Sequence, residues 1–155
     1  MTDYAAQFPA QPRPREDRTL IDVLLETAGA HGDQPAIDDG HTVLSYSELI
    51  VEIRDLALSL AEAGIGPGDK VGIRMPSGSV DLYVAILGTM MLGAAYVPVD
   101  VDDPDERART VFAEAAVTGV ITAGRVIEAR TDRGPLDRAE LRSPTPDDDC
   151  WVIFT

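Results

Sequence analysis

Two segments near the start of the chain carry apolar residues at the spacing of an amphipathic helix. In the first, Thr19 is placed to cap the helix and Gly32 to end it. In the second, Ser45 and Glu48 form the S-x-x-E pattern of a capping box, and Gly64 ends the helix. The positions that recur every three or four residues, and that we expect to face a core, are Leu20, Val23, Leu24, Thr27, Leu49, Ile53, Leu56 and Leu60.

Two further helices are predicted in the middle of the chain. Ser79 can cap a helix over residues 81–92, which is apolar nearly all round and is therefore expected to be buried on most sides. Asp103 is placed to cap the next helix, with Pro104 in its first turn. Asp105 and Glu106 then complement the helix dipole. The apolar residues expected to face inward are Val111, Phe112 and Ala115.

Short extended runs separate these helices. Asp39 and Gly40 form a dipeptide typical of a hairpin turn, between runs at residues 36–37 and 42–44. The run at residues 150–154 is continuously apolar, which predicts a strand covered on both faces. The stretch from 123 to 149 is polar and shows no pattern. The other predicted strands are residues 71–75, 95–99 and 119–122.

Strands and helices alternate through most of the chain, and this order predicts an α/β fold. We expect a mostly parallel sheet with helices on both faces, plus the small hairpin. In such sheets ligands bind beyond the carboxyl ends of the strands, and the sequence stops where such a site would begin. We therefore interpret the chain as part of a larger domain, with a disordered leader over residues 1–18 and the folded part over residues 19–155.

Composition narrows the function classes. The chain of 155 residues has a formal net charge of -14, which disfavours nucleic acid as a partner. No apolar stretch is long enough to span a membrane, and the proline-rich start does not resemble a secretion signal, so we expect a cytoplasmic protein. Cys150 is the sole cysteine and is expected to be a buried strand thiol, since only His31 and His41 could join it in a metal site or a catalytic pair.

Three motifs give the chain a family resemblance. Residues 44–49, LSYSEL, resemble the first core motif of amino-acid adenylation domains, and residues 92–100, LGAAYVPVD, resemble the second, with Met91 where the family often has lysine. Residues 151–155, WVIFT, are similar to the approach to the third, glycine-rich motif. The positions that match the first two motifs and the helix start that follows are Leu44, Tyr46, Glu48, Gly93, Tyr96, Pro98, Asp100 and Arg107.

The resemblance implies a fold and an activity. The fold would be the first subdomain of the large N-terminal domain of adenylate-forming enzymes, truncated before the phosphate loop. The parent enzyme would use ATP and magnesium to form an aminoacyl-AMP and load it on a phosphopantetheinyl carrier. Thr155 matches a phosphate-loop position and would lie near the ATP phosphates. The equal alternative is that Thr155 only ends a strand and binds nothing. No catalytic residue or metal ligand is expected in this chain, whose isolated form is expected to be inactive.

The roles of other residues follow from the same comparison. The eight motif positions are expected to hold the subdomain together, since the capping box explains Glu48 better than general-base chemistry does. Lys70, the sole lysine, matches no catalytic lysine of the family and is expected at the surface. The implied partners are the remainder of the adenylation domain, a peptidyl carrier and the amino acid. Membrane attachment of the parent through other segments stays open.

Within the family, residues 76–88 and 93–115 most resemble the ε-poly-lysine synthetases and related homopolymer synthetases. This resemblance implies a basic amino acid, lysine or diaminobutyrate, as substrate. Two alternatives remain open. An acyl-CoA synthetase or fatty-acyl-AMP ligase shares the fold. Its substrate pocket would be an open apolar tunnel for the acyl chain, whereas an amino-acid pocket would have an acidic residue facing the amine of the substrate. A non-catalytic α/β interaction module would show an exposed apolar flank.

Overall fold

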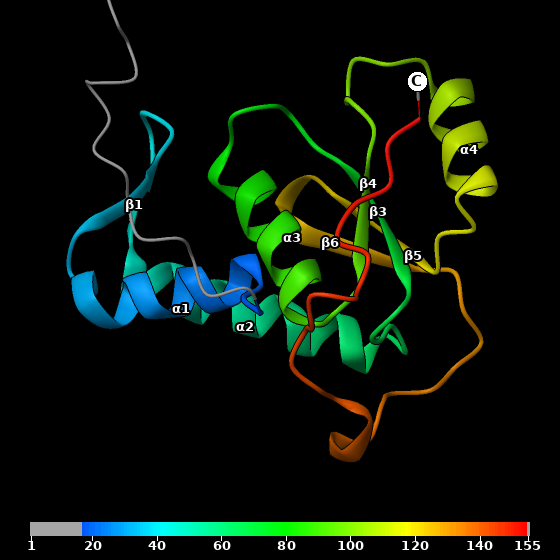
Figure 1. Ribbon diagram of the computed structural model, residues 1–155. Helices are drawn as coiled ribbons and strands as arrows, with labels where there is room; N and C mark the ends of the chain where they lie inside the picture. Colours follow the sequence, from blue (N-terminus) through cyan, green and yellow to red (C-terminus); the bar gives the residue numbers. More distant parts are fainter. Residues whose placement is uncertain (1–16, 155) are drawn as a thin grey trace, which may run out of the picture.

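A sheet with helices on both faces forms the centre of the molecule (Figure 1). The computed structural model describes residues 17–154. Within them the main sheet consists of β3 (Lys70–Arg74), β4 (Ala95–Pro98), β5 (Gly119–Thr122) and β6 (Val126–Ala129), in the order β4-β3-β5-β6. β3 is parallel to β4 and β5, and β6 is antiparallel to β5. The predicted α/β fold with a mostly parallel sheet is confirmed.

The helices divide between the two faces of this sheet. α2 (Tyr46–Glu62) and α3 (Val80–Met91) share one core with β3, and α1 (Leu20–His31) packs against them. α4 (Asp105–Glu114) lies on the other face over a second core (Figure 1). Side chains alternate along each strand, so neighbouring residues of β3 and β4 serve different cores. The largest fully buried side chains are Leu49, Ile53, Leu60, Ile65, Ile73 and Ile121.

The predicted caps of the first three helices are confirmed. The hydroxyl oxygens of Thr19, Ser45 and Ser79 accept hydrogen bonds from backbone N–H groups in the first turns of α1, α2 and α3. Thr19 and Ser45 belong to complete capping boxes, in which an acidic side chain three residues on accepts from the cap's own N–H. These bonds fix where each helix begins, independently of the core.

The start of α4 differs from the prediction. Pro104 precedes the first helical residue, and no side chain caps the helix. Asp103 does not cap, because its carboxylate pairs with Arg107 one turn further on, at 3.2 Å between Oδ2 and Nε. The acidic residues Asp105 and Glu106 occupy the first turn as predicted.

The predicted hairpin is confirmed as β1 (Pro35–Asp38) paired with β2 (Val43–Ser45). Its turn is fixed by Asp39, whose Oδ1 accepts from the N–H groups of His41 and Thr42 at 3.0 and 2.8 Å. Oδ2 of the same carboxylate accepts from the N–H of Val80 at 3.0 Å. The turn is thereby joined to the first residue of α3, 41 positions away. These backbone N–H groups lower the pKa of Asp39 to about 2.

The run at 150–154 is not the covered strand that its composition predicts. Trp151 makes a single parallel bridge with Tyr96. Trp151 is 58% exposed, and Ile153 is 60% exposed. Cys150 is half-buried, so the expectation of a buried strand thiol is also wrong. An apolar run shows that a segment prefers burial, but it does not show which faces the rest of the chain can cover.

The stretch from 123 to 149 holds more structure than its polar sequence indicates. β6 extends the sheet there, after a turn in which Gly124 and Arg125 both have positive φ angles, 72° and 60°. The Arg125 guanidinium pairs with Glu52 of α2, and its Nε lies 3.1 Å from a carboxylate oxygen of Asp81 of α3. Lys70, expected at the surface, is the half-buried first residue of β3.

Two sequence predictions fall wholly or largely on residues that the structure does not describe. The disordered leader over residues 1–18 includes 1–16, and Thr155 follows the last described residue. The proposed boundary at residue 19 and the phosphate-binding role of Thr155 therefore remain predictions.

Candidate functional site

The carboxyl ends of the parallel strands form the edge of the sheet at which a ligand is expected. β3, β4 and β5 end at Arg74, Pro98 and Thr122 on the same side of the sheet. The segment 150–154 runs parallel to β4, because the N–H of Tyr96 donates to the Cys150 carbonyl at 3.0 Å and the N–H of Val152 donates to the Tyr96 carbonyl at 2.9 Å. This last segment therefore points toward the same carboxyl edge.

Asp100 links two loops at this edge. Its carboxylate accepts from the Ser77 hydroxyl at 3.2 Å and from the N–H of Asp102 at 2.9 Å. Ser77 lies in the loop after β3, and Asp102 lies in the loop after β4. The predicted motif position Asp100 thus connects the two loops that follow neighbouring strands, although its side chain is exposed.

Arg74 is a functional candidate that the sequence reasoning missed. One Nη atom lies 2.8 Å from Oδ1 of Asp105, and the other donates to the backbone carbonyl of Asp103 at 2.8 Å. The Arg74 guanidinium lowers the pKa of Asp105, first through this hydrogen bond and second through its charge. The Nε of Arg74 is buried without a hydrogen-bond partner. An arginine that ends a buried parallel strand was the available sequence signal for it.

The cations at the carboxyl edge are engaged by acids of the same chain. Arg74 pairs with Asp105, and Arg107 pairs with Asp103. Binding of a phosphate chain requires free cations or several converging N–H groups. Among residues 17–154 this edge does not hold such a set, and no group of acidic, histidine or cysteine side chains that could hold a metal ion is found there. Binding of phosphates at this edge would need groups besides those of residues 17–154.

The second motif occupies the start and body of β4. Gly93 has a φ angle of 78°, which glycine adopts without strain, and its carbonyl accepts from the N–H of Gly68 at 2.8 Å. Tyr96 pairs through its backbone with β3 and with residues 150–152, and its ring meets Trp151 edge-on, with 6.4 Å between the ring centroids. Burial raises the pKa of the Tyr96 hydroxyl.

The first motif lies apart from the carboxyl edge. Leu44 belongs to β2, Tyr46 begins α2, and the Glu48 carboxylate accepts from the Ser45 N–H at 2.8 Å and from its hydroxyl at 2.7 Å. These bonds lower the pKa of Glu48. No hydrogen bond or ion pair joins Glu48 to Asp100 in the described part of the chain. The structure thus brings Tyr96, Pro98, Asp100 and Arg107 into one region and leaves the first motif at the hairpin and α2.

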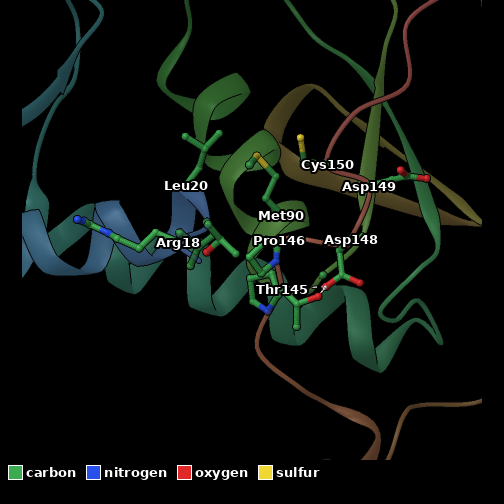
Figure 2. A pocket seen from close by; sticks show the side chains of 13 residues that line it. Arg18, Leu20, Met90, Thr145, Pro146, Asp148, Asp149 and Cys150 are labelled. Carbon is green, nitrogen blue, oxygen red and sulfur yellow. Dashed lines mark hydrogen bonds between the residues drawn. The ribbon is translucent and has the colours of Figure 1, made fainter. Parts of the chain in front are cut away.

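A partly open pocket lies at the opposite, amino edge of the sheet (Figure 2). Its volume is about 180 Å³, and its walls come from the start of α1, the end of α3 and residues 144–150. Asp148 closes the last wall through bonds to Arg142, with oxygen–nitrogen distances of 2.7 and 2.6 Å, and to the Thr145 N–H. These bonds hold the pKa of Asp148 far below its usual value. Gly93 and Ala94, which precede β4, line this pocket, so it is distinct from the carboxyl edge.

Comparisons with known proteins agree on one family. The model of the AMP-binding enzyme family matches residues 24–154. The delta-poly-L-ornithine synthetase of Acinetobacter baumannii (strain AB307-0294) is 30% identical over 93% of this chain and 12% of its own length. The chain therefore spans only a small part of such relatives. No helix among residues 17–154 is long and apolar enough to cross a membrane.

Solved structures show the same relationship. The nonribosomal peptide synthetase FmoA3, in a form with α-methyl-L-serine-AMP bound, has a TM-score of 0.76 and 30% identity, covering 94% of this chain and 18% of FmoA3. NpsA-ThdA from Klebsiella oxytoca, an artificially fused adenylation and carrier-protein di-domain, has a TM-score of 0.72 at 22% identity, over 87% of this chain and 28% of its own. The second likeness shows the fold alone.

Proposed function

Because the chain belongs to the AMP-binding enzyme family and corresponds to the N-terminal part of a nonribosomal peptide synthetase adenylation domain, we propose that it builds one wall of an amino-acid adenylating site. The observation that carries the proposal is the parallel pairing of 150–154 with β4, beside the second motif. This pairing directs the chain to the carboxyl edge, where open α/β sheets bind ligands.

The proposed reaction joins an amino acid to AMP. The amino-acid carboxylate attacks the α-phosphorus of ATP, the bond to the β-phosphate oxygen breaks, and pyrophosphate leaves. FmoA3 supports this chemistry for the family, since its structures include AMPPNP-bound and aminoacyl-AMP-bound forms. We assign Thr155 to the phosphate site and Mg²⁺ to the ATP, with ligands outside residues 17–154. The second step would transfer the aminoacyl group to a phosphopantetheine thiol of a carrier domain.

Within this chain, the proposed roles are structural. Asp100 ties the loops after β3 and β4 through Ser77 and Asp102, while Arg74 ties β3 to the start of α4. Together they fix the edge against which a phosphate-binding loop would pack. The Arg74–Asp105 pair also keeps the Arg74 charge close to compensated, so we assign no direct phosphate contact to Arg74.

The proposed substrate is a basic amino acid. The named product of the delta-poly-L-ornithine synthetase is a polymer of a basic amino acid, and this relative matches 93% of the chain. We therefore propose lysine, diaminobutyrate or ornithine, activated in the cytoplasm. The test is amino-acid-dependent exchange of pyrophosphate into ATP by the natural protein that carries this sequence. Faster exchange with alanine or leucine than with all three basic amino acids would contradict the substrate proposal.

A segment exchange tests the adenylation proposal itself. Residues 24–154 of this chain replace the matched segment of FmoA3, and exchange is measured with α-methyl-L-serine, the amino acid of its bound adenylate. We expect a folded hybrid that retains exchange, whereas the isolated 155-residue chain shows none. A hybrid that melts cooperatively yet lacks exchange, or exchange by the isolated chain, would contradict the assignment.

A further inference from the structure

Pro98, the last residue of β4, presents its backbone to the segment 150–154. In a parallel strand the N–H and the C=O of one residue point to the same neighbouring strand, and the next residue points to the opposite side. The N–H of Val99 donates to the Ile73 carbonyl of β3 at 3.0 Å. Tyr96 and Pro98 therefore direct their backbone groups to the other side of β4, where the segment lies.

Two hydrogen bonds join this segment to β4. The Tyr96 N–H donates to the Cys150 carbonyl, and the Tyr96 carbonyl accepts from the Val152 N–H. In a continuing parallel ladder, the residue at position 98 would donate to the Val152 carbonyl and accept from the N–H of Phe154. Neither of these two bonds is found in the described part of the chain. The pairing therefore stops at the level of Pro98.

The chemistry of proline explains why the ladder stops at this level. Proline has no backbone N–H, and its ring takes the place of that hydrogen. The Val152 carbonyl thus finds no donor in Pro98. The end of β4 is not the cause, because Val99 continues the pairing with β3 on the other side. The interruption is specific to the side that faces the segment 150–154.

The side chain of Phe154 is held although its backbone is not paired with β4. This half-buried ring packs against the second core and lies near Pro104 and Val111, at the side of α4. The N–H of Phe154 makes no bond to Pro98 in the part of the chain that the structure describes. Loops that bind phosphates do so with backbone N–H groups that no strand has engaged.

We propose that Pro98 is a positioning residue of the adenylating site: it ends the pairing with β4 after Val152, so that the backbone beyond forms a loop and not a longer strand. The inference rests on the proposed function, which assigns the phosphates of ATP to this edge. An N–H at position 98 would bond the Val152 carbonyl and bring the Phe154 N–H to the carbonyl of residue 98. The backbone N–H groups would then serve the sheet instead of a ligand.

Two variants that restore the missing N–H test the structural part of the proposal. Pro98→Ala and Pro98→Val are made in the natural protein that carries this sequence, and thermal melting confirms that they fold, as expected for an exposed position. Hydrogen–deuterium exchange, read by mass spectrometry with residue-level fragmentation, measures the Phe154 N–H. We expect it to exchange about twofold to tenfold more slowly in both variants, the effect of one ordinary hydrogen bond. Pro76→Ala, in the exposed loop after β3, is the matched control and should leave this rate unchanged.

Amino-acid-dependent exchange of pyrophosphate into ATP tests the functional part. We expect both Pro98 variants to raise the KM for ATP by about twofold to tenfold and to leave the KM for the amino acid unchanged. Pro76→Ala should change neither constant. If the proline ring served only for packing, the larger valine would restore what alanine loses.

Four results would overturn the proposal. These are an unchanged Phe154 exchange rate in the two Pro98 variants, an equal slowing in Pro76→Ala, recovery of the wild-type values by valine, and slower Phe154 exchange with an unchanged KM for ATP. Failure of the proposed function is a different result, because the wild-type protein would then show no pyrophosphate exchange. The Phe154 exchange rate would still decide whether Pro98 ends the pairing.

Discussion

The contact between Gly72 and Phe112 provides a quantitative test of how α4 packs on the sheet. Gly72 lies in the central strand β3, and a Cβ atom placed on it would approach the Phe112 ring to 2.8 Å at Cε1 and 3.0 Å at two other ring carbons. Carbon atoms prefer separations of about 3.5–4.0 Å, so the ring has to move by roughly 0.7 Å or more. Phe112 is 3% exposed and has little free space for that movement.

We expect Gly72→Ala to destabilise the chain by about 1–2 kcal/mol. Overpacking of a core costs roughly 1–3 kcal/mol, and replacement of a strand glycine by alanine returns about 0.5–1 kcal/mol. Phe112→Leu should cost about 1–2 kcal/mol when introduced alone, because it removes buried apolar volume. In the double variant the smaller side chain makes room for the new methyl group, so the combined loss should be smaller than the sum by about 1 kcal/mol.

Urea unfolding followed by far-ultraviolet circular dichroism measures the four free energies of this cycle. Gly134→Ala serves as a control, since a Cβ at that exposed glycine meets nothing within 4 Å. The packing argument is refuted if the two substitutions add within about 0.3–0.5 kcal/mol, the usual limit for independent sites. A stable Gly72→Ala variant with an unchanged unfolding midpoint would refute it equally.

Three further predictions concern turns and caps. The ionised Asp39 carboxylate stabilises the folded chain above its usual pKa of 3.8, and the wild type loses this stability as the pH falls through about 2. Asp39→Asn should lack this stability at every pH. The free energies of urea unfolding of the two proteins should therefore converge between pH 5 and pH 2. Ser45→Ala should cost about 0.5–2 kcal/mol by removing a cap, whereas Ser59→Ala in the same helix should be close to neutral or slightly stabilising. Gly93→Ala should lower the free energy of unfolding by about 1–2 kcal/mol because Gly93 has a positive φ angle, whereas Gly134→Ala should not lower it. Chemical denaturation compares each serine or glycine variant with its control.

Local rules accounted well for where the helices begin, but not for the buried face of α1, where Leu20 and Val23, expected to face a core, are 64% and 42% exposed. The caps at Thr19, Ser45 and Ser79 could be predicted because a capping bond depends on residues within one turn of each other. The same rule misplaced Asp103, because Arg107 competes for its carboxylate. The joining of Asp39 to Val80 could not be predicted, since it depends on how the hairpin packs on α3.

The candidate site was only partly predictable. The spacing of the second motif correctly indicated a strand with a glycine before it, yet the pairing of Asp100 with Ser77 depends on two loops that are distant in the sequence. The apolar run around Trp151 was misassigned as a covered strand, because hydrophobicity does not show how much partner surface is present. The strand β6 was missed because its four residues are too few to show a pattern.

The strand order β4-β3-β5-β6 has a consequence for synthesis of the chain on the ribosome. β3 emerges first, β4 then adds to one of its edges, and β5 adds to the other. β6 follows outside β5, and the bridge at Trp151 forms last, outside β4. Every strand joins an edge that is free when it emerges, and none has to be inserted between two strands already paired. The sheet can therefore assemble outward from β3 in the order of translation, without earlier pairings having to break.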